Sequence, residues 1–139
     1  MFSPVSARAT SAYSQVGVQS IVDGASPHQL IKMLFDGLMV SVNGARGAME
    51  RGDVGEKMRH LGKAVRILQE GLLSALDRER GGEVANNLAV LYEYCVSRLT
   101  LANVRNDLKL VEEVAGLMKT VAEGWNDMGT QGGTAAAGG

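Results

Sequence analysis

Several features are scarce in this 139-residue sequence, and each scarcity narrows the class of protein. The single cysteine, Cys95, excludes an internal disulfide and is typical of a reducing compartment. The 14 basic and 15 acidic side chains nearly cancel, so no basic surface of the kind that binds nucleic acid is expected. No stretch approaches the roughly 18 continuous apolar residues of a membrane span, and the N-terminal residues contain no apolar run typical of a signal peptide. We therefore expect a cytoplasmic protein that neither binds nucleic acid nor inserts into a membrane.

Proline and β-strand patterns are also scarce. Proline occurs only at positions 4 and 27, and no useful stretch alternates apolar and polar residues. Residues 26–128 instead contain four segments with helical periodicity, joined by short connections that favour antiparallel neighbours. We expect an all-α protein, an antiparallel up-down four-helix bundle. Residues 1–25 would form a mobile N-terminal arm and residues 129–139, which carry no charge, a disordered tail.

The first predicted helix carries more apolar surface than a bundle helix needs. Ser26, Pro27 and Gln29 form a capping box with proline at the first helical position, and the helix should end near Arg51. Its large apolar residues cover about half of the circumference, whereas one stripe of about 100° suffices for a surface helix. They are Leu30, Ile31, Leu34, Phe35, Leu38 and Met39. Another part of this chain or a partner must cover the remaining apolar surface of this helix.

The second predicted helix begins at another capping box, made by Asp53 and Glu56, and should end near Glu79. Gly81-Gly82 is the predicted turn after it. Its apolar residues form one narrow stripe: Val54, Met58, Leu61, Val65, Leu68, Leu72 and Leu76.

The third helix should run from near Glu83 to between residues 104 and 106, and Asn106 or Asp107 should cap the fourth. The periodicity places a few residues in the core: Leu68, Leu72, Leu88 and Cys95.

Signals of catalysis are weak. A di-iron bundle needs Glu-x-x-His pairs, and neither His28 nor His60 has a glutamate three residues before it. We also expect His60 to point away from the apolar stripe. Cys95 lies on an apolar stripe, as a structural cysteine does, and Tyr92 and Tyr94 have no inward-facing base. We expect no metal, no cofactor and no enzymatic activity. Two readings of the glycines inside the helices stay open: compositional bias, or close approach of neighbouring helices.

Surplus apolar surface also occurs on the later helices. Val90, Tyr94 and Leu101 form a second stripe on the third helix, and Leu110, Val114 and Leu117 widen the apolar face of the fourth. Two readings remain open: a fuller core combined with homodimerisation, or a groove for an amphipathic helix of another protein.

The chain resembles a known family in several places. Tyr13, Ala25-Ser26-Pro27, "LIKMLFDG" (30–37), "LDRERGGEVANNLAVLYEYCVSRLTLAN" (76–103) and Trp125 are similar, in order and spacing, to the flagellin-specific secretion chaperones of bacteria, the FliS family. Phe35 replaces the tyrosine usual in that family.

The resemblance implies a cytoplasmic export chaperone. Such a protein binds the disordered C-terminal region of flagellin, prevents its premature polymerisation and keeps it competent for flagellar type III secretion. The flagellar export gate is a second candidate partner, and a weak homodimer is a third association to consider. The expected client-binding residues are Tyr13, Ile31, Phe35, Met39, Val90, Tyr94, Leu101, Leu110, Val114 and Leu117. The alternative is a homo-oligomeric helical adaptor or regulator without a flagellin client.

Overall fold

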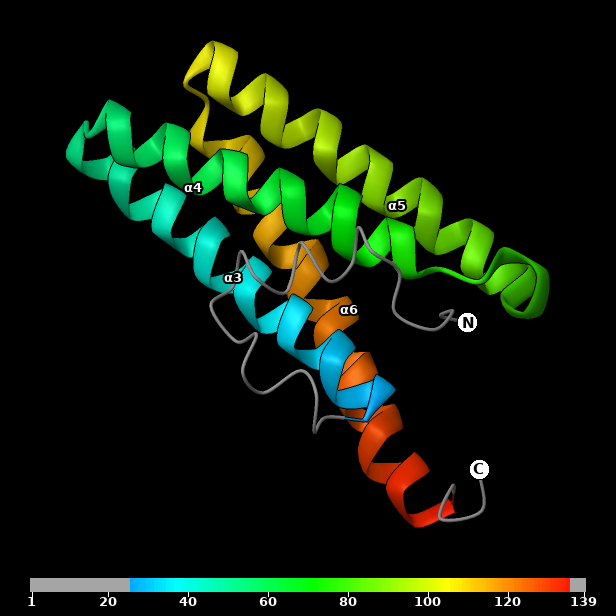
Figure 1. Ribbon diagram of the computed structural model, residues 1–139. Helices are drawn as coiled ribbons and strands as arrows, with labels where there is room; N and C mark the ends of the chain where they lie inside the picture. The colour runs from blue at the N-terminus through cyan, green and yellow to red at the C-terminus, as the bar shows by residue number, and fades with distance from the viewer. Residues whose placement is uncertain (1–25, 136–139) are drawn as a thin grey trace.

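The protein, described here by a computed structural model over residues 26–135, is helical through all its elements (Figure 1). The elements are α3 (Pro27–Arg51), α4 (Val54–Arg66), the π-helix η1 (Ile67–Leu73), α5 (Arg78–Arg105) and α6 (Leu108–Ala135). Because η1 continues α4 as one rod, and the described residues contain no strand, the predicted all-α four-helix architecture is confirmed. The predicted arm, residues 1–25, lies outside the described residues, as do residues 136–139. α6 continues beyond the predicted boundary at residue 128.

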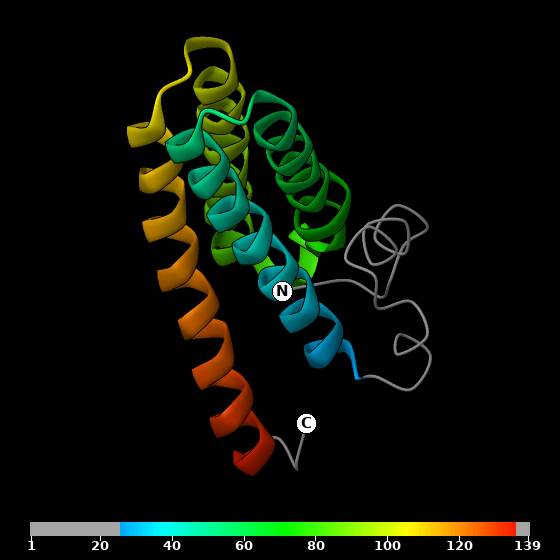
Figure 2. The same cartoon turned by 90° about the vertical axis from the view of Figure 1, so that its left-hand side faces the viewer.

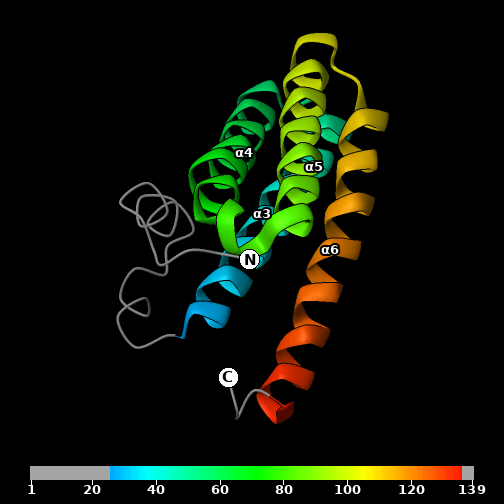
Figure 3. The same ribbon diagram turned by 90° about the vertical axis from the view of Figure 1, so that its right-hand side faces the viewer.

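The four rods form a square arrangement. Figure 2 shows α3 between α4 and α6, and Figure 3 shows α5 between the same two helices on the opposite side. Consecutive helices run antiparallel, as short connections require. The C-terminal part of α6 projects farthest from the bundle (Figures 2 and 3).

Local capping signals set the ends of α3 and the start of α4. The amide of Gln29 donates to Ser26 Oγ at 3.2 Å, and the amide of Ser26 donates to Gln29 Oε1 at 2.9 Å, so the capping box at α3 is complete. Gly52 then ends α3 with φ 73°. At α4 only half of the predicted box forms: Asp53 accepts from the amide of Glu56, while the Glu56 carboxylate binds Arg59.

The second connection contains a short helical turn that the sequence analysis did not predict. The chain leaves the helix after Ala75, and α5 already begins at Arg78, before the glycine pair. Asp77 caps this start, since its Oδ1 accepts from the amide of Arg80 at 3.1 Å. Gly82 then kinks α5 with φ 51° and ψ −129°, a conformation that favours glycine. Gly82 therefore separates this short turn from the long part of α5, at the glycine pair where the sequence predicted a break.

The core lies between the facing sides of all four rods. Leu68, Leu72 and Cys95 are fully buried, as predicted, whereas Leu88 is only half-buried. The largest fully buried side chains are Tyr92, Leu34, Leu38, Ile67, Leu68, Leu72, Leu99, Met118, Val42, Val111 and Val114.

The narrow stripe predicted on the second helix needs two corrections. Ile67, which is not part of the predicted stripe, is fully buried, because it begins the π-helix, whose wider turns change which residues face inward. Val54 and Met58, expected on the stripe, are more than half exposed in the first turns of α4. Lys57, which precedes Met58 in the sequence, is buried instead. Its ammonium donates to the carbonyl oxygen of Asn103 at 3.3 Å, near the C-terminal end of α5.

One glycine is required by the contact between α3 and α4. A Cβ atom on Gly44 would lie only 2.5 Å from Cε1 and 2.6 Å from Nδ1 of His60. The His60 ring therefore packs against the bare backbone of Gly44. At Gly62, Gly116 and Gly124 the same Cβ would meet no heavy atom within 4 Å.

This contact predicts opposite effects for two glycine substitutions. Gly44→Ala should lower the free energy of unfolding by about 1–3 kcal/mol, because the imidazole must move. Gly62→Ala, on the exposed side of α4, should raise it by up to about 1 kcal/mol through helix propensity. Urea denaturation of both variants compares them directly. If both substitutions change the free energy of unfolding equally, the packing of the His60 ring does not require a glycine at position 44.

A second pair of variants tests a buried hydroxyl. Within the described part of the chain, the hydroxyl of Tyr92 is buried without a hydrogen-bond partner. Tyr92→Phe should therefore stabilise the protein by about 1–3 kcal/mol. Tyr94→Phe is the control, since it removes a hydroxyl that donates to Glu113 Oε2 at 2.6 Å, and it should be slightly destabilising. A destabilised Tyr92→Phe variant in thermal unfolding would mean that the hydroxyl has a partner in solution.

Candidate functional site

An apolar groove opens where α3, α5 and α6 meet. Its volume is about 440 Å³, and Val84 and Met128 stand at its rim with 56% and 52% of their surfaces exposed. The lining residues are Phe35, Val84, Leu88, Tyr92, Val121, Gly124, Trp125 and Met128. Leu88, predicted in the core, is half-buried because it forms a wall of this groove. Exposed apolar surface of this kind is suited to an apolar side chain of a partner.

A ring stack fixes one wall of the apolar groove. Trp125 on α6 lies parallel to His28 in the first turn of α3, with ring centroids 4.4 Å apart and an interplanar angle of 11°. The indole Nε1 also donates to the carbonyl oxygen of His28 at 3.2 Å. These contacts hold the C-terminal part of α6 against α3, which explains why the indole can form a rigid wall.

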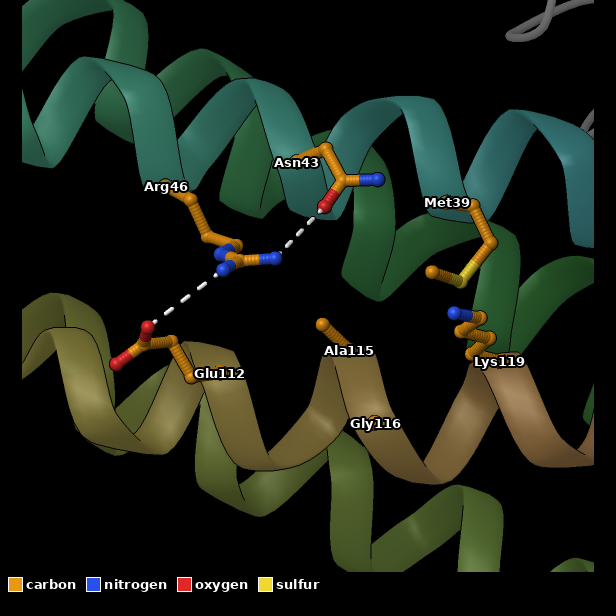
Figure 4. Close-up of a pocket in the computed structure, with 7 residues that line it drawn as sticks. All are labelled: Met39, Asn43, Arg46, Glu112, Ala115, Gly116 and Lys119. Carbon is orange, nitrogen blue, oxygen red and sulfur yellow. Dashed lines mark hydrogen bonds and ion pairs between the residues drawn. The ribbon is translucent and has the colours of Figure 1, made fainter.

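A second groove lies between α3 and α6 and has a mixed character (Figure 4). Its volume is about 480 Å³. We call it the α3–α6 groove; its lining residues are Met39, Asn43, Arg46, Glu112, Ala115, Gly116 and Lys119. Arg46 bridges the two helices, since its guanidinium donates to Asn43 Oδ1 at 3.2 Å and lies 3.5 Å from Glu112 Oε2.

A polar cluster joins the outer sides of α5 and α6. Glu113 accepts from the hydroxyl of Tyr94 at 2.6 Å and from Arg98 Nε at 2.8 Å, and the Arg98 guanidinium lies 5.3 Å from the centre of the Tyr94 ring. The hydrogen bond from Tyr94, followed by that from Arg98, lowers the pKa of Glu113. Exposed Val90 lies one helical turn before Tyr94, so an apolar side chain borders the cluster.

The structure distributes the predicted client-binding residues over three environments. Ile31, Phe35 and Val114 are buried in the core; of these, only Phe35 also lines a groove. Half-buried positions are occupied by Met39, Leu101, Leu110 and Leu117, while Val90 and Tyr94 are exposed. Tyr13 lies outside the described residues. Ile31 and Val114 therefore offer no free surface in this conformation, because both belong to the buried core cluster.

Sequence reasoning missed most of the apolar groove. Val84 and Leu88 on α5, and Val121 and Trp125 on α6, are pairs spaced four residues apart, so each pair lies on one helix face. The four-residue spacing is visible in the sequence, but it does not show which face of α5 lies beside which face of α6.

Cys95 is the single thiol of the chain. Burial raises the pKa of Cys95 to about 12, so its thiol stays protonated and is a poor nucleophile near neutral pH. Among residues 26–128, no three His, Cys, Asp or Glu side chains gather closely enough to hold a metal ion. Within the described helices, none combines the length and apolar character needed to cross a bilayer.

The Glu113 cluster predicts a pH-dependent contribution to stability. Because the folded state lowers the pKa of Glu113, the stabilisation is complete above the carboxyl pKa of the unfolded chain, about 4.3, and disappears as the pH falls through the lower folded value. Glu113→Gln should therefore be less stable than the wild type at neutral pH, and the difference should shrink in acid. Urea unfolding at several pH values measures it, with Glu123→Gln on the same helix as the control. A constant difference between wild type and Glu113→Gln would contradict the assignment.

Two kinds of comparison relate this chain to known proteins. A family model described as "Flagellar protein FliS" matches residues 9–132. The chain is 50% identical to the flagellar secretion chaperone FliS of Salmonella typhimurium over 84% of this chain and 87% of the relative. It is 46% identical to the flagellar secretion chaperone FliSB of Pseudomonas aeruginosa over 86% of this chain and 94% of the relative. It is 33% identical to the flagellar secretion chaperone FliS of Bacillus subtilis over 77% of this chain and 78% of the relative. With a match over nearly the whole bundle, this chain belongs to the FliS family of flagellar proteins.

Proposed function

We propose that this protein is a flagellar secretion chaperone that binds the C-terminal region of flagellin in the bacterial cytoplasm. It would cover the segment through which flagellin subunits associate and so keep the subunit unassembled until export. The apolar groove carries this proposal, since it presents partly exposed apolar side chains on a bundle whose relatives are named secretion chaperones. Tyr13 and the N-terminal arm remain candidate contacts of the same client.

The mechanism is folding of the client on a rigid bundle. A disordered segment that buries about 1,000 Å² of apolar area gains roughly 25 kcal/mol before costs. The loss of conformational freedom in the client offsets most of this gain, which leaves binding that is tight and still reversible. The bundle supplies a preformed surface and has no chemical step to perform, so the protein acts without a cofactor and without catalysis.

Isothermal titration with the C-terminal region of flagellin from the same bacterium tests the proposal. Wild-type protein should bind this fragment, whereas the N-terminal region of the same flagellin should not bind. Val84→Asp at the rim of the apolar groove should weaken binding about tenfold or more, because the carboxylate would be buried without a partner. Val54→Asp is the matched control, since this valine is equally exposed but lies in the first turn of α4, away from the groove.

Two outcomes would contradict the proposal in different ways. If the wild type does not bind the C-terminal fragment, the client is wrong, and concentration-dependent self-association in sedimentation would favour the homo-oligomeric adaptor. If Val84→Asp and Val54→Asp bind equally well, the client is right but the apolar groove is not its site.

A further inference from the structure

The α3–α6 groove has an asymmetric distribution of charge. At one end Arg46 and Glu112 form an ion pair, so their charges largely cancel. At the other end Lys119 carries a positive charge, and within the described part of the chain its ammonium has neither an ion pair nor a hydrogen bond (Figure 4). The groove therefore has a net positive charge, located at Lys119.

The middle of the groove is apolar and has room for a side chain. Met39 contributes a flexible thioether from α3, Ala115 contributes a methyl group from α6, and Gly116 contributes bare backbone. A Cβ atom on Gly116 would meet no heavy atom within 4 Å, so the space above this glycine is open. An apolar side chain can enter here while a charged neighbour reaches Lys119.

This groove is separate from the apolar groove. At 100° per residue, Glu112, Gly116 and Lys119 lie on one face of α6, whereas Val121 and Trp125 lie on nearly the opposite face. A substitution in one groove therefore leaves the lining of the other unchanged, and the two sites can be tested independently.

We infer that the α3–α6 groove binds an amphipathic helical segment of the client that places an aspartate or glutamate carboxylate against Lys119. The inference rests on the proposed chaperone function and adds a second, charged contact to the apolar one. Charge complementarity identifies the occupant: the unpaired ammonium attracts a carboxylate, and Met39 and Gly116 accommodate the apolar face of the same helix. Among the described residues that line the groove, Arg46 is paired with Glu112, so Lys119 is the one unpaired cation and one carboxylate suffices.

The test uses full-length protein and the C-terminal fragment of flagellin from the same bacterium in isothermal titration. Lys119→Glu should weaken binding about tenfold, because one attraction is lost and a repulsion replaces it. Lys109→Glu is the matched control on α6, since Lys109 is exposed and does not line the groove. Added salt should weaken binding by the wild type more than binding by Lys119→Glu.

Two further measurements identify the carboxylate and the groove. Replacing the acidic residues of the fragment by lysine, one at a time, should reveal one position that restores affinity for Lys119→Glu. Gly116→Leu should fill the groove and weaken binding, whereas Gly62→Leu, which adds the same side chain to an exposed site on α4, should not. Circular dichroism confirms that each variant is folded.

The inference is overturned if folded Lys119→Glu binds the fragment as well as the wild type and Lys109→Glu do. It is also overturned if no acidic residue of the fragment compensates for the reversed charge. In both cases wild-type binding to the fragment would stand, so the proposed function would survive the failure of this inference. Absence of any binding by the wild type would instead remove the proposed function and this inference together.

Discussion

The packing of α3 against α4 on one side and α6 on the other is the constraint on which the rest of the structure depends. α3 lies between these helices, so its apolar half-circumference is buried from Leu30 to Ala48. α5 lies opposite α3 in the bundle. It contacts the rod made of α4 and η1 on one side and α6 on the other. Both grooves follow from this arrangement, since each is bordered by α3 and α6 and differs in the face of α6 that it uses.

The sequence predicted the helices well wherever a local signal determines the backbone. Ser26, Gln29 and Gly52 act within one or two helical turns, and the ends of α3 were predicted accurately. At the second connection the sequence predicted the break at the glycine pair, but not the short helical turn before it. Asp77 caps this turn and Gly82 interrupts the helix after it, so both local signals act. The buried Ile67 depends on a π-helix that no sequence spacing indicated.

The candidate site was less predictable because it depends on which helix faces meet. A wide apolar face is the same on a helical wheel whether a client or two neighbouring helices cover it. Ile31 and Val114 were interpreted as client surface, but the neighbouring rods cover them, whereas Val84 and Met128 remain exposed. The contact between Gly44 and His60 shows the same limit, since neither residue is informative until α3 and α4 lie side by side.

The stack of Trp125 on His28 has a consequence for observing this protein in solution. Trp125 is the only tryptophan in the chain, and its indole is at once part of the junction between α3 and α6 and a wall of the apolar groove. Tryptophan fluorescence therefore comes from a single position, without an added dye. Its wavelength and quenching follow the water around that one ring, so an occupant entering the groove and a separation of the two helices both become optical signals from the unmodified molecule.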